Sequence, residues 1–157
     1  MKKLISFLIA AVLFTTTACA AGNKTTSSKG VLLMKLNIQI DNGTSKHMLT
    51  ATLYDNSSSR ALVELLQKGP VTIDMHDYGN FEKVGSLPSS LPRNDTQITT
   101  EPGDIILYQG NQITIYYDTN SWSFTRLGKI DGITKAELKK ILGKGNVTAV
   151  LSIQTSD

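Results

Sequence analysis

Residues 103–130 read GDIILYQGNQITIYYDTNSWSFTRLGKI and contain three apolar runs separated by short polar clusters. The runs cover residues 105–108, 113–117 and 122–130, and they are rich in the β-branched and aromatic residues that favour strands. The clusters QGN and DTNS between them are typical of tight turns. This pattern predicts three consecutive antiparallel strands, a β-meander.

Strand patterns also flank this segment on both sides. Apolar and polar residues alternate over residues 36–40 and 49–53, and the turn sequence DNGT follows the first run. These features predict a hairpin with one buried face. Further strands are expected at residues 71–75 and 147–153, where apolar residues again alternate.

Residues 76–100 have no sustained period and contain Pro88, Pro92 and several Gly and Asn residues. Such a composition is typical of connecting segments. We therefore expect this region to be mostly loop, with room for one short strand at residues 81–84.

Two short helices are expected between the strands. The first covers residues 57–67, is capped by Asn56 or Ser57, and is stopped by the Gly-Pro pair that follows. The second begins with a T-x-x-E capping box at Thr134 and ends before Gly143. Many short strands with two isolated helices, and no repeating βα pattern, predict a mostly antiparallel β-barrel with helices at its ends.

Length and composition are those of a single globular domain. The chain has 157 residues, of which 40% are hydrophobic and 18% are charged. The net charge of +3 includes Lys2 and Lys3, and without them 14 basic residues face 13 acidic ones. A nearly neutral domain gives no indication of nucleic-acid binding.

Residues 1–19 have the pattern of a signal peptide: two lysines, an apolar run over residues 4–14, and then small residues up to Cys19. The apolar run is too short to span a bilayer as a helix. Ala18-Cys19-Ala20 resembles the lipobox of bacterial lipoproteins, in which the cysteine carries the lipid. The alternative is cleavage at an ordinary Ala-x-Ala site, which would release a soluble protein.

Cys19 is the only cysteine of the chain, and lipidation would give its thiol a use. The folded domain would then contain no disulfide, no cysteine nucleophile and no thiolate metal site. Residues 20–30 are small and polar, so we expect a flexible tether between the lipid and a domain that covers residues 31–157. The expected location is the bacterial cell envelope, with a membrane as partner through the lipid.

Three segments resemble the bacterial cyclophilin-like domain family. They are LTATLYDNSSSRALVELL (residues 49–66), DYGNFEKVGSLPSSLP (77–92), and PGDIILYQGNQITIYY with NSWSFTRLGKI (102–130). The resemblance implies a closed antiparallel eight-stranded barrel capped by two short helices. The order of strands and helices expected from the residue pattern agrees with that fold.

The resemblance does not extend to the catalytic residues of cyclophilins. Those enzymes isomerise prolyl bonds with an arginine on a barrel strand, followed by a phenylalanine and a glutamine. In this chain Phe81 can match the phenylalanine, but residues 61–92 contain no arginine and residues 68–96 contain no glutamine. Because fold alone does not carry activity, we expect no catalytic residues and no isomerase activity of the ordinary kind.

Other chemistries have no support in the sequence. The cluster Asp74-x-His76-Asp77 can offer metal ligands, but strand alternation sends neighbouring side chains to opposite faces. We interpret these residues as solvated or hydrogen-bonded. No phosphate loop, dinucleotide fingerprint or hydrolase elbow is present, so neither a cofactor nor a metal is predicted.

A candidate binding groove involves five residues. Alternation places Trp122 and Arg126 on one side of the predicted strand, where Arg126 can meet an anionic or carbonyl group while Trp122, Tyr116, Tyr78 and Phe81 stack on the ligand. The structural alternative is that the aromatic residues are core and that Arg126 reaches the rim. Three functions remain open: binding of a small molecule or peptide, an isomerase with altered residues, and an accessory lipoprotein that acts through protein contacts.

The lipidation of Cys19 is testable in a bacterial host. We expect the unmodified chain to take up labelled fatty acid and to sediment with membranes, and Cys19→Ser to lose both properties. Absence of label in the unmodified chain would contradict the lipobox and favour the Ala-x-Ala cut.

Overall fold

The computed structural model describes residues 34–154, which form nine strands and two helices. Their bounds are β1 Lys35–Asp41, β2 Lys46–Leu53, α1 Ser57–Leu66, β3 Val71–Tyr78, β4 Glu82–Ser86, β5 Thr96–Thr99, β6 Asp104–Tyr108, β7 Gln112–Tyr116, β8 Ser121–Ile130, α2 Lys135–Leu142 and β9 Val147–Ile153.

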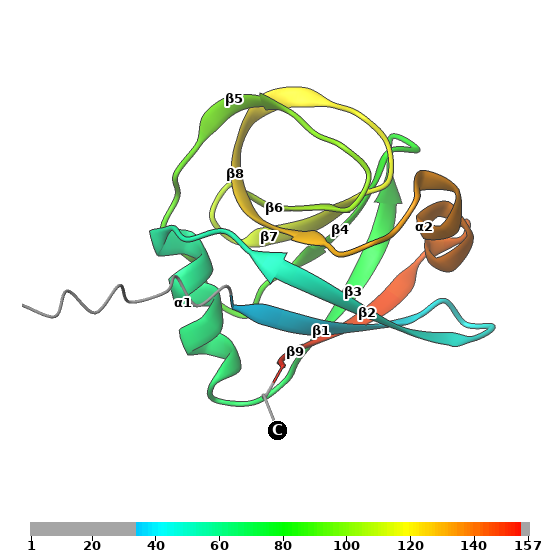
Figure 1. Ribbon diagram of the computed structural model, residues 1–157, viewed down its shortest axis with the longest axis horizontal. Coiled ribbons are helices and arrows are strands. Elements are labelled where there is room, and N and C mark those ends of the chain that lie inside the picture. The colour runs from blue at the N-terminus through cyan, green and yellow to red at the C-terminus, as the bar shows by residue number, and fades with distance from the viewer. Residues whose placement is uncertain (1–33, 155–157) are drawn as a thin grey trace, which may run out of the picture. The chain divides into compact units, whose positions relative to one another are not determined.

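Eight of these strands close into a barrel (Figure 1). Their order around the ring is β2-β1-β9-β3-β4-β7-β6-β8, and pairing of β2 with β8 closes it. All pairs are antiparallel, and β5 lies outside the ring because it pairs only with the first half of β8. The closed antiparallel eight-stranded barrel expected from the sequence is confirmed.

The barrel interior is filled by the apolar face of each strand. In β1, Leu36, Ile38 and Ile40 are buried while the residues between them are partly exposed, as the alternation predicted. Opposite strands contribute Leu107, Ile113, Ile115, Leu127, Ala149 and Leu151 to the same core. Burial of this continuous apolar surface is the main force that holds the barrel closed.

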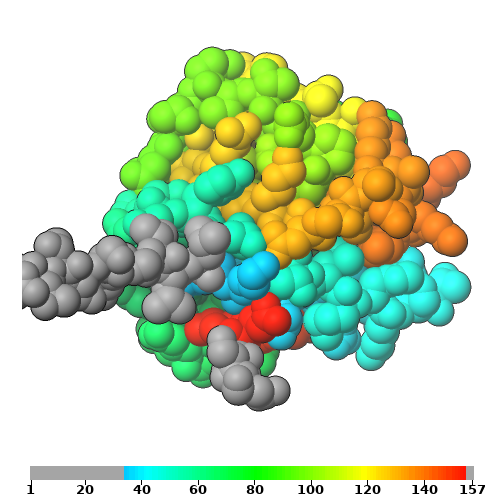
Figure 2. All heavy atoms as spheres, viewed as in Figure 1, coloured from blue at the N-terminus to red at the C-terminus, as the bar shows by residue number. Residues whose placement is uncertain are grey.

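Both predicted helices are confirmed and cover opposite ends of the barrel (Figure 1). Helix α1 is capped by the side chain of Asn56, and α2 by the predicted capping box of Thr134 and Glu137. Leu62 and Leu66 of α1, and Leu138 of α2, join the core. The β1–β2 hairpin and α2 lie side by side at one edge of the domain (Figure 2). The Asn42 side chain of the hairpin turn donates a hydrogen bond to the carbonyl of Ile141 in α2.

The predicted meander is correct in its strands but wrong in one pairing. Strand β8 follows β7 in the chain, yet it pairs with the far edge of β6 and with β2. The reason is that the free edge of β7 is already occupied by β4. A long β8 can therefore join β5, β6 and β2, which is what closes the ring.

The short strand expected at residues 81–84 is confirmed as β4, but residues 76–100 contain more strand than predicted. Strand β3 continues to Tyr78, β4 covers Glu82–Ser86, and β5 covers Thr96–Thr99. Gly79 and Asn80 both have positive φ and form a tight turn that is closed by a hydrogen bond from the Phe81 N–H to the Tyr78 carbonyl (3.3 Å). Residues 79–81 thus connect the paired residues Tyr78 and Glu82. The alternation fails in β4 because Glu82, Lys83, Val84 and Gly85 are all buried.

The hydrogen bonds of Lys83 explain in part why β4 can be buried on both faces. Its side chain is 0% exposed, and its ammonium group donates to Asp77 (2.7 Å), to the carbonyl of Gly145 (2.6 Å) and to that of Gly143 (3.2 Å). Asp77 also accepts a hydrogen bond from the hydroxyl of Tyr117 (2.6 Å). Three acceptors satisfy the three donors of the ammonium group, which is the condition for burying a lysine.

Residues 1–33, which include Cys19 and the predicted signal peptide and tether, lie outside the described residues. Neither helix in the described range 34–154 is long and apolar enough to cross a membrane.

Closure of the ring depends on Gly128, which pairs with Leu53. A Cβ at this position would lie 2.6 Å from the carbonyl oxygen of Thr52 and 3.1 Å from the Cα of Leu53. We expect Gly128→Ala to lower the free energy of unfolding by ~1–3 kcal/mol, because the closing strands must separate. Chemical denaturation measures the effect, with Ser123→Ala on the exposed part of β8 as the control. Equal stability of both variants would show that the closing pair is not tightly packed.

Candidate functional site

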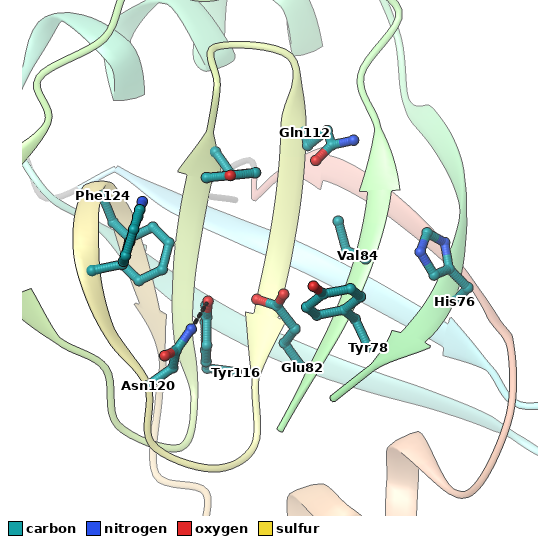
Figure 3. A pocket seen from close by; sticks show the side chains of 10 residues that line it. His76, Tyr78, Glu82, Val84, Gln112, Tyr116, Asn120 and Phe124 are labelled. Atoms are coloured by element: carbon teal, nitrogen blue, oxygen red, sulfur yellow. Dashed lines mark hydrogen bonds between the residues drawn. The ribbon is translucent and has the colours of Figure 1, made fainter. Parts of the chain in front are cut away.

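A cleft of about 320 Å³ lies on the outer face of the barrel (Figure 3). Adjacent strands β3, β4, β7, β6 and β8 supply its walls, and the barrel core lies on their other face. Half of its ten lining residues are tyrosine, tryptophan or phenylalanine: His76, Tyr78, Glu82, Val84, Tyr108, Gln112, Tyr116, Asn120, Trp122 and Phe124.

Five aromatic rings form a continuous row along this face. Ring centroids are 5.9 Å apart for Tyr78 and Phe81, 6.0 Å for Phe81 and Tyr116, and 5.7 Å for Tyr116 and Phe124. Phe124 then meets Tyr108 edge-on at 6.1 Å. These separations are those of favourable ring pairs, so the row is a rigid apolar wall.

Two large aromatic side chains remain exposed beside the cleft. Trp122 is 60% exposed and Tyr78 is 59% exposed, although both are aromatic residues that burial would stabilise. Both also line the cleft. Large aromatic side chains that stay exposed around a concave surface are typical of binding sites.

Glu82 lies among these rings with only 7% of its surface exposed (Figure 3). Its Oε2 atom is buried and has no hydrogen-bond partner among residues 34–154. Burial raises the pKa of this carboxyl group, and hydrogen bonding from the Tyr116 hydroxyl works in the opposite direction. A buried acid without a complete set of partners is costly, so its presence needs a reason beyond stability.

Tyr116 completes the polar part of the cleft. Burial and the neighbouring Glu82 raise the pKa of its hydroxyl, which therefore stays protonated. The side-chain amide of Asn120 approaches the same hydroxyl at 3.4 Å. The cleft can thus offer one carboxyl group, the phenols of three tyrosines and two amides, those of Asn120 and Gln112, to a bound molecule.

The structure brings together four of the five residues predicted from the sequence. Tyr78, Tyr116 and Trp122 line the cleft, and Phe81 stacks on Tyr116 from the turn after β3. The interpretation of Trp122 as barrel core is wrong, because β8 begins beyond the barrel interior and carries this side chain outside. Phe124 is buried, but in the outer aromatic cluster rather than in the interior.

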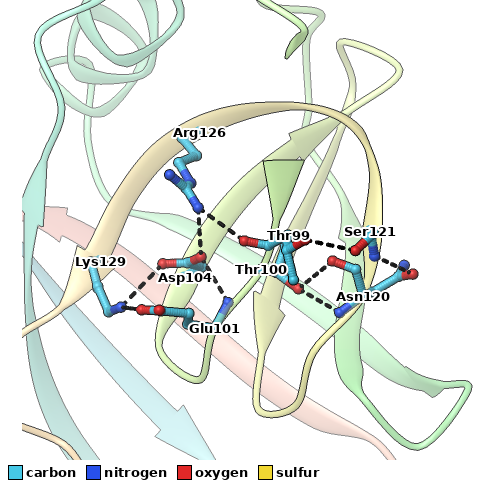
Figure 4. Close-up of polar contacts among 8 residues, drawn as sticks. All are labelled: Thr99, Thr100, Glu101, Asp104, Asn120, Ser121, Arg126 and Lys129. Carbon is cyan, nitrogen blue, oxygen red and sulfur yellow. Dashed lines mark hydrogen bonds and ion pairs between the residues drawn. The ribbon is translucent and has the colours of Figure 1, made fainter. Parts of the chain in front are cut away.

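Arg126 does not line the cleft, and its contacts are with Thr99 and Asp104 (Figure 4). It donates to the carbonyl of Thr99 (3.0 Å) and forms an ion pair with Asp104 (3.7 Å), which is 2% exposed. Lys129 approaches the same carboxylate at 3.6 Å and also pairs with Glu101. Arg126 therefore belongs to a network that fixes the start of β6 against β8.

Glu82, Tyr108, Gln112 and Asn120 are cleft residues that the sequence did not single out. The signal for Glu82 was present: the Gly-Asn turn at residues 79–80 predicts a hairpin, and the strand after it contains two adjacent charges. The other three depend on which strands become neighbours, which only the ring order determines.

Asp74, His76 and Asp77, which were considered as metal ligands, do not face a common site. Asp77 accepts from Lys83 and Tyr117, whereas Asp74 accepts from the hydroxyl of Thr148 (3.0 Å). His76 lines the cleft instead. No group of three potential metal ligands occurs within the part of the chain that the structure describes.

Comparison with known proteins agrees with the architecture. A model of the cyclophilin-like family matches residues 39–152, from β1 to the last strand. A search of curated proteins found no match. The family match covers more than half of the chain and the same closed barrel, so this chain belongs to the cyclophilin-like family.

Proposed function

We propose that this chain is a binding domain whose aromatic cleft holds a small molecule or a peptide segment. The observation that supports this proposal most strongly is Glu82, a buried carboxyl group with an unpartnered oxygen in a cleft flanked by exposed Trp122 and Tyr78. A ligand would cover the exposed rings and give the carboxyl group a partner. Both changes would recover free energy that the unliganded domain lacks.

The size of the cleft sets the scale of the ligand. A volume of about 320 Å³ fits a small metabolite or one to two side chains of a peptide. The walls come from strands rather than loops, so the rings keep their positions before the ligand arrives. Such preorganisation reduces the entropy lost on binding.

The cleft gives less support to an isomerase with altered residues. No arginine lines it, and Arg126, the nearest candidate from the sequence, is paired with Asp104. A prolyl isomerase must stabilise a twisted amide, and an arginine would supply the charge-assisted donor for that task. The proposed function is therefore binding without turnover.

Export and lipid anchoring are part of the same proposal. Cys19 would attach the domain to a membrane of the cell envelope, and residues 20–30 would act as the tether. The cleft would then meet ligands that reach the envelope rather than those of the cytoplasm.

Binding can be followed through Trp122, the only tryptophan of the chain, which lies in the cleft. We expect a screen of metabolites and short peptides to give ligands that change its fluorescence. Tyr78→Ala should weaken them by about 1 kcal/mol, roughly fivefold in Kd, because one wall of the cleft is lost. Tyr54→Ala is the control, since Tyr54 is also exposed but does not line the cleft. Equal losses in both variants would contradict the assignment of the cleft.

Arg126→Gln separates binding from stability. We expect it to lower the free energy of unfolding by ~1–3 kcal/mol, because Asp104 loses one of its two cations and Thr99 loses a donor. The Kd of any cleft ligand should change less than twofold. A large loss of affinity with unchanged stability would instead make Arg126 part of the binding site.

Turnover can be tested with a proline-containing peptide. We expect the purified domain to leave cis/trans exchange at its spontaneous rate, which takes tens to hundreds of seconds. An acceleration that scales with protein concentration and disappears in Tyr116→Phe would assign isomerase activity to the cleft.

A further inference from the structure

The residues that line the cleft include an acid but no lysine or arginine to balance it. Among the ten lining residues Glu82 is the only acid. His76 is the one lining residue that can become cationic, and its side chain is exposed on β3. The cleft is therefore electronegative, although the whole chain is not.

Nearby cations are already paired elsewhere. Lys83 follows Glu82 in the chain but points to the opposite face of β4, where Asp77 and two carbonyl groups accept its hydrogens. Arg126 is held by Asp104 and Thr99. Neither side chain can turn toward Glu82 without leaving a buried acceptor unsatisfied. Among residues 34–154 the structure gives the buried oxygen of Glu82 no donor, so a ligand that enters the cleft can supply one.

The aromatic rings that line the cleft also favour a positively charged ligand. The face of an aromatic ring is electronegative and attracts cations. Tyr78, Tyr108, Tyr116, Trp122 and Phe124 all line the cleft, and Glu82 lies among them. An anionic ligand would face both a carboxylate and ring faces, whereas a cation would be attracted by each of them.

The lining also favours an alkylated cation over a plain one. A primary ammonium group needs up to three hydrogen-bond acceptors to replace its water. The cleft offers mainly ring surface, with acceptors limited to Glu82 and a few amide and hydroxyl oxygens. Methyl groups on the nitrogen would pack against the rings while their positive charge faces the carboxylate.

We propose that the ligand of this cleft carries an alkylated ammonium group, bound between the aromatic walls with Glu82 as its counter-ion. This inference rests on the proposed binding function and names its ligand class. It replaces the anionic or carbonyl-rich ligand expected from Arg126. The ligand can be a free quaternary amine or a methylated amine on a larger molecule, since both share the same cationic group.

The test compares choline with 3,3-dimethylbutan-1-ol, which has the same shape but a carbon atom in place of the charged nitrogen. Trp122 fluorescence and calorimetry measure both Kd values on the folded domain. We expect choline to bind at least tenfold more tightly than the alcohol. Glu82→Gln should abolish that difference without lowering the melting temperature, and Glu64→Gln, on the surface of α1, should leave it unchanged.

The outcomes distinguish this inference from the proposed function. If the alcohol binds as tightly as choline, or if neither binds at millimolar concentration, the cationic ligand class is wrong. If uncharged metabolites or peptides then still bind in a manner sensitive to Tyr78→Ala, the cleft remains a binding site. If Glu82→Gln retains the preference for choline, Glu82 is not the counter-ion and the inference is overturned.

Discussion

Strand β4 is buried on both faces although it contains two adjacent charged residues, Glu82 and Lys83. The arrangement of the barrel and of the cleft depends on where these two side chains find partners. Lys83 lies opposite Ile115 of β7 and faces the inner side, while Glu82 lies opposite Tyr116 and faces outward. The lysine finds three acceptors at one end of the barrel. The glutamate finds an aromatic cluster and keeps one oxygen without a partner. One strand thus supplies a structural anchor on its inner face and a buried carboxyl group to the cleft on its outer face.

The incomplete hydrogen bonding of Glu82 affects the stability of the unliganded domain. Because the folded state raises the pKa of Glu82 above its ordinary value of 4.5, folding favours the protonated form. Its contribution to stability is full below pH 4.5 and is lost as the pH rises through the folded pKa. Once the pH exceeds the folded pKa, the domain therefore carries a destabilising ionised group. A bound cation would reverse this effect, which couples ligand binding to folding.

Sequence patterns predicted the elements that have one buried and one exposed face. The hairpin of β1 and β2, both helices with their caps, and β9 follow directly from periodicity and capping residues. The extent of strand β4 was difficult to predict, because burial on both faces removes the alternation of apolar and polar residues. The position of β8 beside β6, and hence the meeting of Tyr108 with Phe124, depends on which strand edges are free. The prediction that Arg126 belongs to the binding groove failed because its partner lies on another strand. Its guanidinium group pairs with Asp104 of β6, which the local sequence around Arg126 does not show.

The most direct test of the central role of Glu82 is its own titration, observed through the carboxyl carbon by NMR with and without choline. We expect a midpoint above the ordinary range of glutamate in the free domain and a lower midpoint when choline is bound, because the cation stabilises the carboxylate. The titratable groups that line the cleft with it, His76, Tyr78, Tyr108 and Tyr116, would be followed in the same spectra. An ordinary midpoint that choline leaves unchanged would show that Glu82 is not the counter-ion of a cationic ligand.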